Sequence, residues 1–308
     1  MTTAAPVRTA VPAAVLRLLL PYHRTTGPGS PDPADHPEQL DQIRTFTDAG
    51  EPVLLTLPGF PCKSPNPAKV LGHLPDEGER LSLEFLNGLC ARIAEVYEPG
   101  ARLVICSDGH IFGDVIHVPD PHIDAYGDGL RALIRDAGLS HLDTFDLRSV
   151  HGDADHDTKR RLVTEAYAPS LDVLREQVRA DEETARLYRG ITRFLVEDTA
   201  DFTGSRSALQ RECRLRAYEV IARSRAWGDL IADHFPRSVR LSIHPQPVGA
   251  PKFGIRLLEA GDAWATPWHT AVLRDAGGVA RLMRRDEAEG RGRLVRRGGA
   301  PSHFEAEG

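Results

Sequence analysis

Several features that are common in enzymes are rare or missing in this 308-residue sequence. Lysine supplies only four of the 38 Lys and Arg residues, which makes each lysine more informative than usual. The four cysteines have neither zinc-type nor redox-type spacing, so we interpret them as small core residues of a cytoplasmic protein. No apolar run reaches the ~18 residues that a membrane span needs. The apolar stretch 11–20 contains Arg17, and we interpret it as a short amphipathic helix and not as a signal peptide.

Familiar cofactor motifs are also missing. The sequence has no glycine-rich dinucleotide fingerprint, no Walker loop and no nucleophile elbow. The run 151–157 resembles a calcium loop, because Asp153, Asp155 and Asp157 match its first three ligands. However, Thr158 replaces the required glycine and Thr164 the closing glutamate, so an acidic first turn of a helix explains the run better. We therefore expect a reaction without a cofactor and predict no metal site.

The overall charge argues against a nucleic-acid surface, since the formal net charge is −6. One predicted helix carries a basic cluster, in which Glu212 and Glu219 are interleaved. Its basic members are Arg206, Arg211, Arg214, Arg216, Arg223 and Arg225. A solvated helix face with internal ion pairs is favoured over a track for phosphates. The hydrophobic content of 41% is that of an ordinary soluble globular protein, with no nucleic-acid or membrane partner expected.

The order of the periodic segments predicts an α/β fold with a Rossmann-like, largely parallel sheet. Apolar strands are expected at 53–57, 102–106 and 142–147, with helices at 37–48, 79–96 and 122–137 around them. Strand-like runs return at 239–243 and 253–258, with a weaker one at 270–273. These late strands either extend the same sheet or form a small antiparallel companion.

We predict a single α/β catalytic domain over residues 36–283, with a helical segment at 155–235. Residues 1–35 are expected to be a loose N-terminal segment with a short helix. Residues 284–308 are rich in Arg, Glu and Gly, with almost no apolar content, and we expect a flexible tail.

The loop 58–66 is the most informative stretch, because it follows a buried strand and carries three prolines. It presents the ammonium of Lys63, the hydroxyl of Ser64 and the amide of Asn66 on a stiff backbone. In open α/β sheets, ligands bind at the carboxyl ends of the strands, so a phosphorylated or polyhydroxylated ligand is favoured here. The alternative is that Lys63 is a solvated loop residue.

Further candidates also follow strands, and each has a structural alternative. Asp108, and Asp114 after it, could orient an amine or a diol, or could cap backbone N–H groups in a turn. His244 ends a strand and is placed for acid–base work, although most single histidines are structural or exposed.

Lys252 and Arg256 fall at strand spacing and could clamp one anion. In the segment 266–269, Trp268 could form a pocket wall with His269 as a polar tip, or the segment could be a plain hydrophobic corner.

Six motifs occur in the order found in the isonitrile (isocyanide) synthases, the pyoverdine and dityrosine biosynthesis proteins. The chain resembles this family from about residue 40 to residue 275. The motifs are GFPCKSPN at 59–66, Ser107-Asp108-Gly109 with Phe112 and Asp114, Tyr188-Arg189-Gly190 with Arg193, Phe194, Glu197 and Asp198, RLSIHP at 240–245, Lys252-Phe253-Gly254, and Thr266-Pro267-Trp268-His269.

The resemblance implies a reaction that needs no metal and no nucleotide. The α-amine of an amino acid, typically L-tyrosine or L-tryptophan, condenses with the C2 ketone of ribulose 5-phosphate. The imine then breaks down, with loss of phosphate and the rest of the sugar, and leaves one carbon on nitrogen as an isonitrile.

The resemblance also implies roles for the site residues. A phosphate clamp is expected from Lys63, Lys252 and Arg256, and a proton shuttle from His244 or, as second choice, His269. A lowered pKa would instead make Lys63 a base. Asp108 and Asp114 would receive the ammonium and the diols. The other implied substrate-binding residues are Ser64, Asn66, Arg193, Arg240 and Trp268.

Two other functions stay open at this point. One is a different sugar-phosphate lyase or isomerase that forms its own lysine imine, and the other is a non-catalytic ligand-binding homologue. The sequence does not identify the amino-acid substrate. Family members commonly act beside an iron/2-oxoglutarate oxygenase or a cytochrome P450, which are therefore the expected pathway partners.

Overall fold

A computed structural model describes residues 5–259 and 265–307 of the chain. Its central feature is a sheet of five parallel strands in the order β3-β2-β1-β4-β5. The strands are β1 (Val53–Pro58), β2 (Ala101–Cys106), β3 (Leu142–Phe145), β4 (Val239–Ser242) and β5 (Phe253–Gly254). This arrangement confirms the predicted α/β class and the largely parallel sheet.

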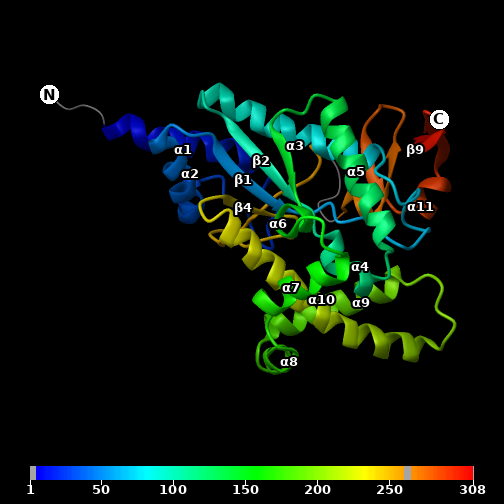
Figure 1. The fold of residues 1–308 in the computed structure, drawn as a ribbon. Helices are drawn as coiled ribbons and strands as arrows, with labels where there is room; N and C mark the ends of the chain where they lie inside the picture. The colour runs from blue at the N-terminus through cyan, green and yellow to red at the C-terminus, as the bar shows by residue number, and fades with distance from the viewer. Residues whose placement is uncertain (1–4, 260–264, 308) are drawn as a thin grey trace.

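Helices cover both faces of this sheet (Figure 1). Leu55, Leu103 and Ile105 pack with helices α1 (Ala5–Leu19), α2 (Pro37–Ala49) and α3 (Glu77–Val96). Val104 points the other way, toward a cluster that contains Trp227 and Leu230 of α10 (Arg206–His234). Because neighbouring residues of a strand point to opposite faces, the near-continuous apolar runs of β1 and β2 fit a sheet buried on both sides.

The remaining helices connect the strands and build the helical segment. After β2 come α4 (Gly109–Ile116) and α5 (Asp120–Asp136), and after β3 comes α6 (Leu147–His151). Four helices follow within the segment expected to be helical, namely α7 (His156–Tyr167), α8 (Leu171–Ala180), α9 (Glu182–Asp198) and α10. Asp155 caps α7 by accepting a hydrogen bond from Thr158 N, 2.9 Å away, so the run 151–157 does contain a helix start.

The expected flexible tail is wrong. The segment contains the helix α11 (Arg285–Glu289) and the strands β8 (Gly292–Arg297) and β9 (Ala300–Ala306). These two strands join β6 (Ala271–Arg274) and β7 (Ala280–Met283) in a second sheet. Its order is β7-β6-β9-β8, with one parallel pair between β6 and β9. The backbone pairing of β9 on both sides, and the burial of Phe304 against Leu273 and Ala288, compensate for the low apolar content.

The N-terminal segment is also less loose than expected. Val15, Leu16 and Leu19 of α1 are buried in the main core. Short 3-10 helices follow at η1 (Leu20–Tyr22) and η2 (Pro33–Asp35). His23 forms an isolated antiparallel bridge with Ile255, which fixes this segment beside β5. Within the described residues, no helix combines the length and apolar character that crossing a membrane requires.

Candidate active site

The strand order identifies where a ligand should bind. The chain passes from β1 to β2 on one side and later returns to β4 on the other side of β1. In open parallel sheets this reversal creates a crevice beyond the carboxyl ends of the two central strands. The segments that leave β1, β2 and β4 there begin at Gly59, Ser107 and Ile243, so most of the predicted candidates lie at this edge.

The loop after β1 is held against the 3-10 helix η3 (Pro267–His269). The backbone N–H of Ser64 donates to the carbonyl of Trp268 at 2.8 Å, and the rings of Phe60 and Trp268 lie 5.0 Å apart. Gly59 permits this contact, since a Cβ there would lie 3.2 Å from the Trp268 ring. Trp268 is almost fully buried, so it supports the loop as a hydrophobic corner and does not line an open pocket.

Lys63 does not face a ligand. Its Nζ is fully buried and lies 2.8 Å from Asp76 Oδ2, 2.7 Å from Glu79 Oε2 and 3.0 Å from the Pro267 carbonyl oxygen. Burial alone would lower the pKa of Lys63, but the two carboxylates raise it above its usual value. With its donors satisfied inside the protein, Lys63 connects the loop to the start of α3 and to η3. The expected clamp or base role does not fit this position.

Positive side chains gather along β4 and at the start of β5, since Arg240 lies within β4 and Lys252 immediately precedes β5. Arg240 and Lys252 both approach Gly228 of α10. A Cβ atom placed on Gly228 would lie 3.7 Å from Arg240 Nη2 and 3.9 Å from Lys252 Nζ, so the two cations are close to the same residue. Burial and then Arg240 lower the pKa of Lys252. We call Arg24, Arg240 and Lys252 the cationic group.

His244 lies beside the cationic group. Burial, Arg24 and Lys252 lower the pKa of His244, although its side chain reaches solvent. Arg24 is itself buried, and its Nη1 donates to the Ile243 carbonyl. Sequence reasoning missed Arg24. A backbone hydrogen bond from Arg24 N to Gly254 O, 2.9 Å long, places it beside β5, and such a contact between distant backbone atoms cannot be recognised in the sequence.

His269 belongs to a second polar group. Its Nδ1 lies 3.0 Å from Thr266 Oγ1 and its Nε2 lies 3.8 Å from Asp198 Oδ2. Asp198 also forms a buried ion pair with Lys69. Burial lowers the pKa of His269 to about 4. Asp198 raises this pKa, whereas Lys69, Lys63 and His244 lower it further. The imidazole is therefore neutral near pH 7.

Asp108 lies at the start of α4, at the same edge of the sheet. Its Oδ1 is buried and has no hydrogen-bond partner among the described residues, and its side chain does not cap the helix. Burial raises the pKa of Asp108 to about 7. The alternative of a simple capping residue therefore does not account for this carboxyl group.

Other predicted residues are held elsewhere. Asp114 pairs with Arg223 of α10, with Oδ2 and Nη2 2.9 Å apart. Arg193 has a side chain that is 80% exposed, and its Nε lies 3.9 Å from Glu197. Asn66 Nδ2 donates to the Glu197 carbonyl at 2.7 Å. These three contacts stabilise surface structure and do not point to the crevice.

Ser64 and Arg256 also differ from expectation. The Oγ atom of Ser64 accepts from Asn66 N at 3.1 Å, so it shapes the loop. Strand β5 has only two residues, so Arg256 is not related to Lys252 by strand spacing. Its backbone N–H donates to the Tyr22 carbonyl at 3.0 Å, and its Nε is buried without a hydrogen-bond partner among the residues described.

A cavity of about 230 Å³ lies on another side of the loop after β1. Its walls include Lys63, Ser64, His73, His122 and Arg285. Neither His244 nor His269 lines it. We take the carboxyl edge of the sheet, and not this cavity, as the candidate site, because the strand ends and several pKa-shifted groups lie at that edge.

Comparisons with known proteins agree with this geometry. A family model described as pyoverdine/dityrosine biosynthesis protein matches residues 43–295. The L-tyrosine isonitrile synthase of Pseudomonas aeruginosa is 46% identical over 307 residues, which cover 96% of this chain and 94% of that protein. The L-tryptophan isonitrile synthase AmbI2 of Fischerella ambigua is 41% identical over 268 residues, covering 86% and 81%.

A solved structure extends the match to three dimensions. The crystal structure of the PvcA protein from Pseudomonas aeruginosa matches with a TM-score of 0.90 and 46% identity, covering 96% of this chain and 100% of that chain. The resemblance carried by the six motifs is therefore confirmed. The chain belongs to the pyoverdine/dityrosine biosynthesis protein family, which includes the isonitrile synthases.

Proposed function

We propose that this protein is an isonitrile synthase with L-tyrosine or L-tryptophan as substrate and ribulose 5-phosphate as the one-carbon donor. The amine attacks the C2 ketone and water leaves to give an imine. Fragmentation then breaks both carbon–carbon bonds of C2, releases phosphate and the other four sugar carbons, and leaves C2 on the nitrogen as the isonitrile carbon. The names of the two relatives support the reaction type and the class of amino acid.

One observation about the candidate site supports the proposal. The cationic group meets His244 at the crevice, in a chain that is 46% identical to a named L-tyrosine isonitrile synthase. A sugar phosphate would bring a dianion to a place where Arg240 lowers the pKa of Lys252, and where Arg24 and Lys252 lower the pKa of His244. Binding would therefore oppose these effects of positive charge as well as orient the sugar.

The two histidines supply the proton transfers. Because Lys252 and Arg24 help to lower the pKa of His244, a bound phosphate would raise it again and let the imidazole accept a proton. His269 is neutral and its Nδ1 is oriented by Thr266, so it can act as a hydrogen-bond acceptor or base. Asp108 offers an unpaired carboxyl oxygen to the substrate ammonium.

The test is incubation of the purified protein with ribulose 5-phosphate, labelled with ¹³C at C2, and each proteinogenic amino acid in turn. Mass spectrometry should find one amino acid that gains a labelled carbon and loses both amine hydrogens. A lack of such a product with every amino acid contradicts the proposal. Stabilisation by both ligands without turnover would then identify a binding protein.

A lysine-imine enzyme is the second candidate, because burial lowers the pKa of Lys252 and favours a neutral, nucleophilic amine. Borohydride reduction during incubation with ribulose 5-phosphate separates the two mechanisms. The synthase mechanism predicts no sugar adduct on the protein, whereas the second candidate predicts an adduct on Lys252.

We also propose that the protein acts in the cytoplasm, since its four cysteines are free and buried. An isonitrile amino acid is a reactive intermediate, so an oxidising enzyme such as an iron/2-oxoglutarate oxygenase or a cytochrome P450 is the expected next partner.

A further inference from the structure

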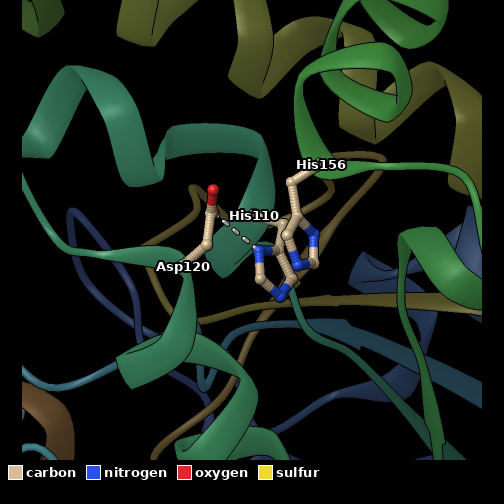
Figure 2. Close-up of side chains that lie close together, drawn as sticks. All are labelled: His110, Asp120 and His156. Carbon is tan, nitrogen blue, oxygen red and sulfur yellow. Dashed lines mark hydrogen bonds and ion pairs between the residues drawn. The ribbon is translucent and has the colours of Figure 1, made fainter.

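Two histidines and two aspartates form a compact cluster outside the candidate active site. His110 lies on α4, Asp120 and Asp124 lie on α5, and His156 is the first residue of α7. The imidazole rings of His110 and His156 are stacked with their centroids 3.8 Å apart and their planes 11° from parallel (Figure 2). Ligand atoms of His110, Asp120 and His156 all lie within 4.8 Å of one another.

Asp120 holds His110 in place. His110 Nδ1 lies 3.1 Å from Asp120 Oδ1, the contact drawn as a dashed line in Figure 2. The guanidinium of Arg160 donates to both oxygens of Asp120, at 2.8 and 3.0 Å, which fixes the carboxylate. A carboxylate that receives the Nδ1 proton leaves Nε2 of the same ring as the free metal-binding nitrogen.

Asp124 is placed to act as a third ligand of a bound ion. Its Oδ1 is 3.0 Å from His110 Nε2, and its Oδ2 is 3.3 Å from His156 Nε2. Two ligands that are each ~2.1 Å from one transition-metal ion are themselves about 3 Å apart. Asp124 forms no ion pair with lysine or arginine among the described residues, and its side chain is 53% exposed, so water can complete the coordination.

We propose that His110 Nε2, His156 Nε2 and Asp124 form a binding site for a divalent transition-metal ion of the zinc class. Imidazole nitrogen and carboxylate oxygen suit zinc, cobalt or nickel, whereas calcium and magnesium prefer oxygen ligands alone. The nearly parallel rings must turn toward each other to share one ion. His110 is the anchored ligand, and His156 moves more easily because its Nδ1 has no hydrogen-bond partner among the residues described.

The ion would connect three helices. It would tie the first turn of α4 to α5 and to the start of α7, which begins the helical segment. The proposed site is therefore a structural metal site that stabilises the packing of α4 against α5 and α7. It supplies no step of the proposed reaction.

The test uses Co²⁺ and Zn²⁺ with the full chain after treatment with a chelator. Equilibrium dialysis should find one bound Zn²⁺ per chain, and Co²⁺ should give visible d–d absorption bands typical of nitrogen and oxygen ligands. Zn²⁺ should also raise the thermal unfolding midpoint, because it binds the folded chain.

Matched variants localise the ion. His156→Gln and Asp124→Asn remove one ligand each and should abolish the Co²⁺ bands and the rise in midpoint. Asp120→Asn should weaken binding by about 10- to 100-fold, with the stoichiometry of one retained, because it only orients His110.

His122→Gln is the control, since His73 and His122 are also stacked, 4.2 Å apart and 16° from parallel, and have no carboxylate partner among the described residues. It should bind like the parent protein. The proposal is overturned if the parent protein binds no Co²⁺ or Zn²⁺, or if His156→Gln and Asp124→Asn bind as the parent does. A loss of binding in His122→Gln alone would also overturn it.

Discussion

At the residue scale, the buried ammonium of Lys63 holds the loop after β1 in place. One cation stabilises two carboxylates, and Tyr126 donates to Glu79 from the other side at 3.0 Å. Breaking a buried pair leaves an uncompensated charge, which costs more than the pair itself contributes.

We therefore predict that Lys63→Met lowers the free energy of unfolding by about 3–5 kcal/mol. Chemical denaturation with urea measures this change. The double variant Lys63→Met/Glu79→Gln should lose less than the sum of the two single variants, because one of the stranded charges is removed. Parent-like stability of Lys63→Met would show that the ion pair contributes little.

His269 is one of the two histidines that the proposed function assigns to proton transfer. We predict that His269→Gln lowers kcat by about 10²–10⁴-fold, since it removes a positioned base. The unfolding midpoint at pH 7.5 should change little. His234→Gln on α10 serves as the control, since the ring of His234 contacts its own helix carbonyl at 2.9 Å and neighbouring aromatic rings. Equal turnover in the two variants would remove His269 from the mechanism.

Sequence reasoning found candidate residues near the ends of the predicted apolar strands. His244, Lys252, Arg240 and Asp108 could be found because each lies at or near the end of an apolar run. Arg24 and Lys69 could not, because their contacts are with Ile243 and Asp198, which are distant in the sequence.

At the element scale, β4 and the start of β5 position two members of the cationic group. Arg240 lies on β4, Lys252 immediately precedes β5, and α10 supports both through Gly228. This group contains no substrate-transforming base of its own, so its expected work is binding.

We predict that Lys252→Met raises KM for ribulose 5-phosphate by about tenfold or more, because one charge-assisted contact to phosphate contributes ~1.5–3 kcal/mol. KM for the amino acid should change much less. Arg237→Met, which removes a surface cation paired with Glu51 at 2.8 Å, is the control. An unchanged KM for the sugar in Lys252→Met would place the phosphate elsewhere.

At the scale of the whole molecule, two half-buried histidines couple stability to pH. Burial lowers the pKa of both His23 and His269 to about 4, with a contribution from His36 at His23. Lys69, Lys63 and His244 face His269 and disfavour its protonation, while Asp198 favours it. Below the ordinary histidine pKa of ~6.5, the unfolded chain binds protons that the folded chain does not.

The contribution of His269 is isolated by comparing the parent protein with His269→Gln. As pH falls from 7.5 to 4.5, the parent should lose about 2–3 kcal/mol of stability relative to the variant. The comparison removes the opposite effect of Asp76, whose pKa burial raises to about 7. Urea unfolding at the two pH values measures the difference. A constant difference between parent and variant would contradict the lowered pKa of His269.

The parallel sheet could be predicted because its strands are uniformly apolar and alternate with amphipathic helices. In the second sheet, β6 falls on the strand expected at 270–273, but β8 and β9 could not be predicted. Half of β8 is arginine and β9 contains a proline, and both strands acquire their order from pairing with each other and with β6. The turn Gly298-Gly299, with both residues at positive φ, was the available signal for that hairpin.

A crystal structure of the protein with ribulose 5-phosphate bound tests the central claim most directly. The account predicts that the phosphate lies within hydrogen-bond distance of Lys252 Nζ and of the guanidinium of Arg240 or Arg24, with the sugar carbons beside His244. A phosphate bound instead in the cavity beside His73, His122 and Arg285 would contradict it.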